Sequence, residues 1–227
     1  MSSGGEGPGK AGEPVLILVH GLMSAHRMWV PQLESLGQRC SLVVPDLPGY
    51  GASPGPFSLD EAAGRIASLM AGHDEVHVCG LSLGAMVALR AAAREPGRVA
   101  SLILSGVQVH PPALLCAVQR LVMKLVPAAK FSAGDPDVRK DTVLAVIGEL
   151  ARADLRGDLS RITARTLVIC GSADRVNLGA ARAAAAGITG AELRVIPGAG
   201  HVWNLQQPEV FNRIVGDWVS LTSAGGA

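Results

Sequence analysis

Six short runs of apolar residues recur along the chain, and each is bounded by turn-forming residues. Most of these runs are continuous rather than alternating, which is typical of parallel strands that are buried on both faces of a sheet. The runs lie at residues 15–19, 41–45, 76–79, 101–105, 166–170 and 192–196. The pattern therefore predicts six buried, parallel strands.

Segments of helical length and periodicity separate most of the runs. They cover residues 59–71, 83–94, 178–187 and 208–221. Alternation of strand and helix is the pattern of an α/β protein with right-handed crossovers. We therefore predict the α/β class, with a mainly parallel six-stranded open sheet and helices on both of its faces.

One interval is too long for a single crossover, namely residues 106–165 between the fourth and fifth runs. A helix is expected where apolar residues recur at helical spacing, at Leu114, Val118, Leu121, Val122 and Leu125. A second helix is expected over residues 138–153. We interpret the interval as a small helical lid. The alternative is an ordinary helical layer, in which the apolar stripe would pack against the sheet as core.

The length of 227 residues favours one domain with one well-buried core. We place this domain at residues 15–227 and expect a flexible tail at residues 1–14, which are polar and rich in glycine. A net charge of +1 and an aromatic content of 3% provide neither a basic groove nor a stacking platform, so no nucleic-acid partner is expected.

No window approaches 18 uninterrupted apolar residues, and the first residues lack the pattern of a signal peptide. We therefore expect a cytoplasmic protein without a membrane partner. The four cysteines are far apart, and three of them lie in or beside apolar runs. Neither disulfides nor a metal site is expected.

A G-x-S-x-G pattern follows the third run at residues 80–84, with Ser82 at its centre. This pattern marks a nucleophile elbow when a strand precedes it and a helix follows, and both are predicted here. Gly80 and Gly84 leave room for a sharp turn, and the N-terminal end of the alanine-rich helix would face Ser82. The backbone N–H of Leu83 could then stabilise an oxyanion.

A serine nucleophile needs a base, and the base needs a carboxylate that orients it. His201 lies in a glycine-rich loop after the sixth run, and Asp174 follows the fifth run. Catalytic groups of open α/β sheets gather at these carboxyl ends. His201 as a loop-capping residue is the alternative. Asp46 is a less favoured acid, since it is expected to tie down its own turn.

Five blocks occur in a fixed order: His20-Gly21, "DLPGYGAS", "GLSLG", "GSAD" and "GAGH". Together they resemble the α/β-hydrolase superfamily. The resemblance implies that Leu22 supplies the second oxyanion N–H and that His20 is structural. Similar proteins begin with an antiparallel hairpin, which residues 1–14 cannot form. The run at 41–45 should then lie near an open edge that the tail or a second copy in a homodimer could cover.

These features predict a serine hydrolase that cleaves a carboxylic ester, thioester or lactone through an acyl-enzyme on Ser82, without a cofactor. A small to medium apolar substrate is expected, with Met23, Leu121, Val202 and Trp203 as binding residues. Two alternatives stay open. One is a lyase, cyclase or carbon–carbon hydrolase that uses the same triad, and the other is a ligand-binding protein with a vestigial triad.

Overall fold

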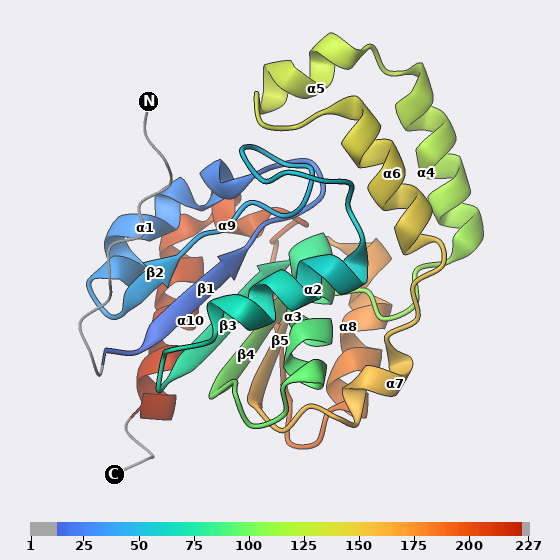
Figure 1. Cartoon of the computed structure of the whole chain (residues 1–227). Coiled ribbons are helices and arrows are strands. Elements are labelled where there is room, and N and C mark those ends of the chain that lie inside the picture. Colours follow the sequence, from blue (N-terminus) through green and yellow to red (C-terminus); the bar gives the residue numbers. More distant parts are fainter. Residues whose placement is uncertain (1–12, 224–227) are drawn as a thin grey trace.

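The computed structural model describes residues 13–223 and contains one six-stranded sheet (Figure 1). The strand order is β2-β1-β3-β4-β5-β6, and every neighbouring pair is parallel. The strands are β1 (Val15–Val19), β2 (Ser41–Val43), β3 (Val76–Leu81), β4 (Ser101–Ser105), β5 (Arg165–Gly171) and β6 (Glu192–Ile196). The predicted fold class is confirmed, while most of the predicted tail lies outside the described residues.

Alternate residues of the central strands enter two separate cores. In β1, Ile17 and Val19 belong to one core, which we call the first core, whereas Leu16 and Leu18 belong to the other, the second core. Every residue of β1, β3 and β4 is buried, because helices cover both faces of the sheet. This double burial explains why the sequence shows continuous apolar runs rather than alternation.

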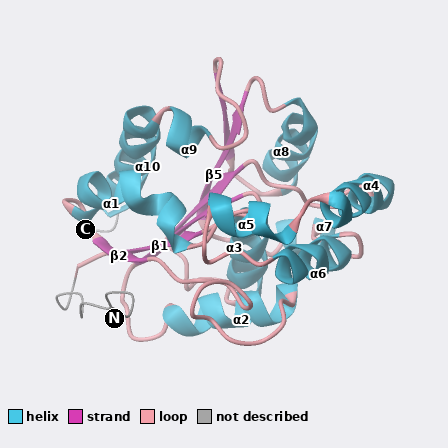
Figure 2. Cartoon of the chain, turned by 90° about the horizontal axis from the view of Figure 1, so that it is seen from above, coloured by secondary structure: helices cyan, strands magenta, loops and turns pink. Residues whose placement is uncertain are grey.

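The helices form two layers, which are seen on opposite sides of the sheet in Figure 2. The first layer consists of α2 (Leu59–Leu69), α3 (Leu83–Arg94) and α8 (Arg175–Gly187). The second consists of the short 3₁₀ helix η1 (His26–Trp29), α1 (Val30–Gly37), α9 (Trp203–Gln206) and α10 (Pro208–Ser223).

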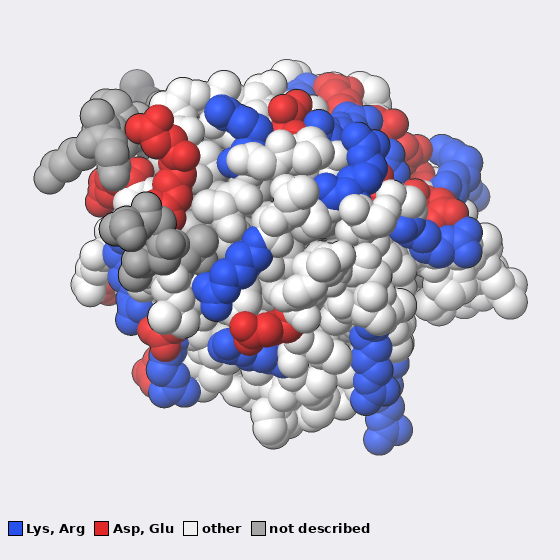
Figure 3. Space-filling model, turned by 90° about the horizontal axis from the view of Figure 1, so that it is seen from below, with Lys and Arg blue, Asp and Glu red and all other residues white. Residues whose placement is uncertain are grey.

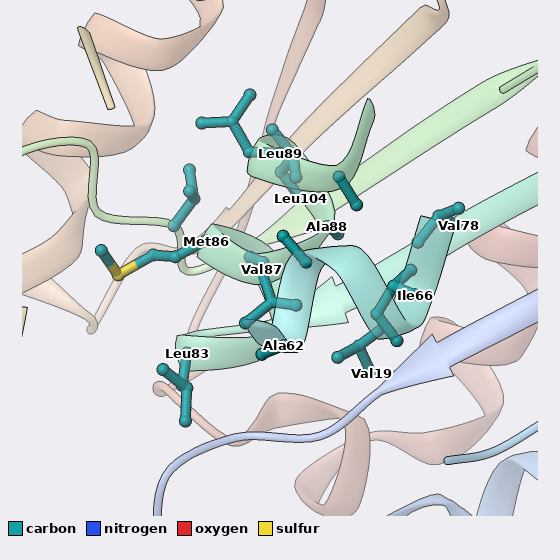
Figure 4. Packing of buried hydrophobic residues seen from close by; sticks show 14 of the residues in the cluster. Val19, Ala62, Ile66, Val78, Leu83, Met86, Val87, Ala88, Leu89 and Leu104 are labelled. Carbon is teal, nitrogen blue, oxygen red and sulfur yellow. The ribbon is translucent and has the colours of Figure 1, made fainter. Parts of the chain in front are cut away.

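The alanines of α3 let this helix approach the sheet closely. Figure 4 shows Val87 and Ala88 of α3 beside Ala62 and Ile66 of the neighbouring helix α2. At the start of α3, a Cβ atom on Gly84 would collide with the backbone carbonyl of Val19 in β1. The glycine thus fixes how closely the first turn of α3 meets the sheet.

Four helices occupy the interval between β4 and β5: α4 (Ala113–Leu125), α5 (Ala128–Gly134), α6 (Lys140–Leu150) and α7 (Arg156–Leu159). The helices α4 and α6 match the two that the sequence predicts, whereas α5 and α7 were not predicted. Val143, Val146 and Ile147 of α6 are buried in the first core. Helix α4 packs on α6, and its apolar stripe is exposed, so the alternative in which this stripe packs against the sheet as core is wrong. Opening and closing of this insertion as a lid stays a prediction.

The edge strand β2 lies beside the first described residues of the chain and is hydrogen-bonded to them. The backbone N–H of Ser41 donates to the carbonyl of Pro14 at 3.0 Å, and the Ser41 hydroxyl donates to the carboxylate of Glu13 at 2.9 Å. Among residues 13–223, no hairpin precedes β1. No helix in this range combines the length and the apolar character that crossing a bilayer requires.

Candidate active site

Ser82 lies on the sharp turn between β3 and α3. Its φ and ψ are 57° and −113°, and it is the one non-glycine residue with positive φ in the described part of the chain. Such a backbone is strained for a residue with a side chain and persists only where surrounding contacts hold it. The backbone N–H of Ser82 donates to the carbonyl of Ser105 at 2.8 Å, which ties the turn to β4.

Three residues from separate loops meet at the carboxyl ends of the strands. The Nε2 atom of His201 lies 2.9 Å from the Oγ atom of Ser82. The Nδ1 atom of the same ring lies 2.7 Å from the Oδ2 atom of Asp174. Asp174 is 7% exposed, whereas the side chain of His201 is 36% exposed. The structure therefore brings together the three residues that the sequence selects as a triad.

The backbone beside His201 is shaped to admit its imidazole ring. Gly106 follows β4 with a φ of +60°, and a Cβ atom there would lie 3.1 Å from two ring atoms of His201. Gly171 ends β5, and a Cβ atom there would collide with the carbonyl of Ala199 in the loop that carries His201. Glycine at both positions thus allows His201 to reach between Ser82 and Asp174.

The charge of Asp174 sets the proton positions in this arrangement. Burial raises the pKa of its carboxyl. The hydrogen bonds from His201 and Asn177 lower this pKa by a larger amount, so the net pKa lies below its usual range. An ionised carboxylate accepts the Nδ1–H of His201. The Nε2 atom is then unprotonated and accepts a hydrogen bond from the Ser82 hydroxyl.

Two polar residues behind Asp174 were missed by the sequence analysis. The side-chain amide of Asn177 donates to the Oδ1 and Oδ2 atoms of Asp174 at 2.8 and 2.9 Å. The amide of Gln108 donates in turn to the Oδ1 atom of Asn177 at 2.8 Å. Asn177 is a polar residue one turn after Asp174 on α8, which was a usable signal. Gln108 lies in the loop after β4.

The loop after β1 lies next to Ser82, as the predicted oxyanion role of Leu22 requires. A Cβ atom on Gly21 would lie 3.8 Å from the Cβ atom of Ser82. The hydroxyl of Tyr50 donates to the carbonyl of Leu22 at 2.8 Å and holds this loop. Leu83 opens α3, where the first backbone N–H groups have no partner within the helix. The oxyanion roles of Leu22 and Leu83 stay predictions.

His20 is fully buried below the same loop. Its Nε2 atom accepts the backbone N–H of Leu47 at 3.0 Å, and its Nδ1–H donates to the carbonyl of Gly21 at 2.9 Å. Burial lowers the pKa of His20 to about 4, so the ring is neutral at neutral pH. Both ring nitrogens serve to shape the loop, in agreement with a structural role.

Acid should therefore destabilise the fold through His20. Between pH 6.5 and about 4 the unfolded chain binds a proton at His20 that the folded chain does not, so the free energy of unfolding falls as the pH is lowered. The full loss is roughly 3 kcal/mol. Urea unfolding across this range should show a weaker pH dependence for His20→Gln than for wild type and for His73→Gln. An unchanged dependence in His20→Gln would contradict the assignment.

The predicted substrate-binding residues differ in where they lie. Met23 is exposed beside Leu22, and Val202 is half-buried beside His201. The prediction for Trp203 is wrong: it is 1% exposed, packs against Phe211 with ring centres 4.7 Å apart, and donates its indole N–H to the Ser105 hydroxyl at 2.9 Å. This side chain points into the second core, because α9 turns its apolar surface towards the sheet.

The prediction that Leu121 binds substrate also needs correction. It is 61% exposed on α4, which lies at the rim of the molecule (Figures 1 and 2). The structure therefore does not bring Leu121 to the triad. Asp46, the alternative acid, accepts the backbone N–H and the Nδ1–H of His26, each at 2.9 Å. Asp46 thus holds the loop after β1, which is a contact outside its own turn.

Comparisons with known proteins agree with this architecture. The chain matches the model of the alpha/beta hydrolase family over residues 16–214. An AB hydrolase superfamily protein of Gibberella zeae is 29% identical, with 92% of this chain and 80% of that protein covered.

Two solved structures are similar over nearly their whole lengths. NosK from Streptomyces actuosus is 29% identical, covers 93% of this chain and 99% of its own, and has a TM-score of 0.76. A hydrolase from Pseudomonas aeruginosa PA01 is 26% identical, covers 91% of this chain and 90% of its own, and has a TM-score of 0.79. With the family model matching most of its length, the chain belongs to the alpha/beta hydrolase family of enzymes.

Proposed function

We propose that the protein is a serine hydrolase that cleaves a carboxylic ester, thioester or lactone through an acyl-enzyme on Ser82. The observation that carries the proposal is the continuous hydrogen-bonded line from Asp174 through His201 to Ser82, with distances of 2.7 and 2.9 Å. A nucleophile, a base and a group that orients the base within hydrogen-bond reach constitute the arrangement that activates a serine.

The reaction begins when the Oγ atom of Ser82 attacks the carbonyl carbon of the substrate. The Nε2 atom of His201 takes the hydroxyl proton as the new bond forms, and the carboxylate of Asp174 stabilises the resulting imidazolium. The carbonyl oxygen becomes an oxyanion, for which the backbone N–H groups of Leu22 and Leu83 are the proposed donors. His201 then returns the proton to the leaving alkoxide or thiolate as the tetrahedral intermediate collapses.

Water completes the cycle on the acyl-enzyme. His201 takes a proton from this water, which attacks the acyl carbon and forms a second tetrahedral intermediate. Collapse of this intermediate breaks the bond to the Oγ atom of Ser82, and His201 gives its proton back to that oxygen. The acid is released and the starting state of the triad is restored. Every proton transfer uses the Nε2 atom of His201, which faces Ser82.

The side chains beside the triad favour an apolar group next to the scissile bond. Met23 follows Leu22 and is exposed, and Val202 follows His201 and is half-buried. Both would bury apolar surface against an acyl or alkyl group, at about 0.8 kcal/mol per methylene. We therefore propose a small to medium apolar substrate, and a panel of straight-chain esters, thioesters and lactones would identify the preferred class.

A fluorophosphonate probe tests the proposal without knowledge of the substrate. The native protein should bind one equivalent covalently at Ser82, because the activated Oγ atom attacks phosphorus as it would attack a carbonyl carbon. Ser82→Ala should not react, whereas Ser220→Ala, which alters a serine on α10, should react like wild type. Intact-mass analysis would measure the labelling. A native protein that does not react would favour a ligand-binding protein with a vestigial triad.

The activity should rise with pH along a single limb. Only neutral His201 can accept the proton of Ser82, so kcat/KM increases as this imidazole loses its proton. The lowered pKa of Asp174 keeps its carboxylate charged through the weakly acidic range, so its own titration lies below that limb. A pH series with a fast-leaving ester would measure the profile. A flat profile from weakly acidic to neutral pH, with chemistry rate-limiting, would contradict a histidine base.

A further inference from the structure

Helix α4 turns most of its large apolar residues towards solvent. Six of the thirteen exposed large apolar residues in the described part of the chain lie on this helix, with exposed fractions between 46% and 79%. We call them the α4 apolar face: Leu114, Leu115, Val118, Leu121, Val122 and Leu125. A contiguous apolar surface of this kind commonly marks an interaction site in a soluble protein.

The positions of the α4 apolar face form one continuous arc. At about 100° per residue they fall within an arc of about 120°, which is the width of a core-facing stripe in an ordinary surface helix. Here the arc points outwards, and Cys116 on the other side is the one buried residue of the helix. Helices such as α10 show the usual orientation, with Phe211 and Val215 directed into the core.

The orientation of α4 is fixed by specific contacts. Its inner side packs on α6, which lies between α4 and the sheet in the view of Figure 1. The ammonium group of Lys140 on α6 donates to the backbone carbonyls of Lys124 and Val126 at 2.7 and 2.6 Å, at the end of α4. A cation at this position interacts favourably with the negative, C-terminal end of the helix dipole and stabilises the helix. The apolar face is thus held outwards at the rim.

The charged side chains of α4 and α5 themselves have one sign. Residues 96–134 contain no Asp or Glu, and Arg120, Lys124 and Lys130 are exposed on α4 and α5. Other surfaces differ, since acidic and basic side chains lie side by side on the face in Figure 3. Pairing of two copies through α4 would bring cations together without an acidic partner from this helix. An anionic surface that also accepts leucine side chains complements both properties.

We propose that the α4 apolar face binds the surface of a membrane that contains anionic lipids, with the helix lying in the plane of the headgroups. A helix with leucines on one side and basic residues beside them has the properties of an interfacial helix, and its place at the rim lets a planar surface reach it. No membrane partner was expected from the sequence, because it has neither a long apolar window nor a signal-peptide pattern, but an interfacial helix requires neither. The proposal does not depend on the chemistry of Ser82.

Co-sedimentation with vesicles tests the proposal. The protein should bind vesicles of equal parts phosphatidylcholine and phosphatidylglycerol, should bind phosphatidylcholine alone more weakly, and should be released by salt. Leu121→Gln with Leu125→Gln should weaken binding about tenfold or more. Leu221→Gln is the matched control, because Leu221 on α10 is 62% exposed and Leu121 is 61% exposed. This control should bind like wild type.

Charge variants separate the two contributions. Lys124→Gln should weaken binding to the anionic vesicles about fivefold, whereas Arg213→Gln, which removes the same charge from α10, should not. Ser82→Ala should bind like wild type, so failure of this proposal is distinguishable from failure of the proposed hydrolase activity. The proposal is overturned if the anionic vesicles bind no protein or if Leu121→Gln with Leu125→Gln binds normally. A dimer in light scattering that these substitutions dissociate would show instead that a second copy covers the face.

A separate observation concerns Asn177, and this second inference rests on the proposed function. Its amide nitrogen donates to both oxygens of Asp174 and lies 3.0 Å from the Nδ1 atom of His201, and its own oxygen accepts from Gln108 at 2.8 Å. The bond from Gln108 fixes which end of the Asn177 amide faces the carboxylate. We infer that Asn177 is a positioning residue, which holds the plane of the Asp174 carboxylate and withdraws part of its negative charge from His201.

Removal of this donor should change the titration of the base. In Asn177→Ala the carboxylate of Asp174 concentrates its charge on His201, which favours the imidazolium, so the rising limb of kcat/KM should move to higher pH. We expect kcat to fall about tenfold, with KM little changed. Asn177→Ser, which keeps one donor, should bring the rising limb part of the way back to its wild-type position.

A spectroscopic measurement keeps this inference testable without activity. The proton between His201 and Asp174 should give a downfield NMR resonance that moves in Asn177→Ala, and fluorophosphonate labelling at Ser82 should persist. A pH profile and a resonance that both match wild type in a folded Asn177→Ala protein would refute the positioning role. A native protein that fluorophosphonate does not label at Ser82 would instead refute the proposed function itself.

Discussion

Ser82→Ala should lower ester turnover about 10⁴-fold or more, because it removes the atom that forms the acyl-enzyme. The remaining activity would come from the proposed oxyanion donors and from substrate binding. Stability should change little, since Ser82 is only half-buried and the substitution deletes no core volume. Steady-state kinetics with a p-nitrophenyl ester and urea unfolding of the same preparation would measure both quantities.

A serine in a neighbouring loop provides the control for this substitution. Ser172 lies after β5, and its hydroxyl accepts the backbone N–H of Gly198 at 2.8 Å. His201 bonds to Ser82 and Asp174 instead. Ser172→Ala should therefore keep most of the activity. Residual turnover of Ser82→Ala within about tenfold of wild type would mean that another group is the nucleophile.

Most of the fold was predictable because the central strands β1, β3 and β4 are buried on both faces. Burial of this kind leaves a local signature, a continuous apolar run, and the helical segments between the runs then indicate crossovers between parallel strands. The turn at Ser82 was predictable for a similar reason. Gly80 is required by its contact with the backbone of Gly84 and Ala85, so that requirement is visible in a short stretch of sequence, whereas the contact of Gly84 with Val19 is long-range.

The errors arise where the local pattern leaves a direction open. Periodicity identifies an apolar stripe on α4 but contains no information on whether the stripe faces the sheet, a cavity or solvent. Trp203 has the same ambiguity, since its position next to Val202 and His201 does not show that its ring points to Phe211. Only the packing of whole elements decides between these directions.

Long-range polar contacts were missed for a different reason. Asn177 and Gln108 lie far apart in the sequence, and they act together only because β4 and β5 are neighbours in the sheet. The sequence shows each as a single polar residue near a strand end. A search for uncharged donors near each carboxyl end would have included both, because a buried carboxylate needs donors as well as a cation.

The contacts of Asp174 make its amide variant the sharpest test of the acid. Asp174→Asn should lower kcat about 10⁴-fold, as expected when the orienting carboxylate becomes an amide. Asn177 donates to both oxygens of Asp174, and His201 donates to one of them. An asparagine at 174 must direct its own NH₂ group at one of these donors. If that donor is His201, the ring adopts the tautomer with Nε2–H, which cannot accept the proton of Ser82.

Asp46→Asn is the matched control for this test. Asp46 accepts hydrogen bonds from His26, and the structure records no bond from it to His201 in the described residues. Its kcat should stay near that of wild type, although the loop after β1 loses part of its support. Parallel measurements of kcat and of urea unfolding for both variants would separate catalysis from stability. If Asp174→Asn retained near-normal kcat while Asp46→Asn lost it, then Asp46 rather than Asp174 would be the acid that serves His201.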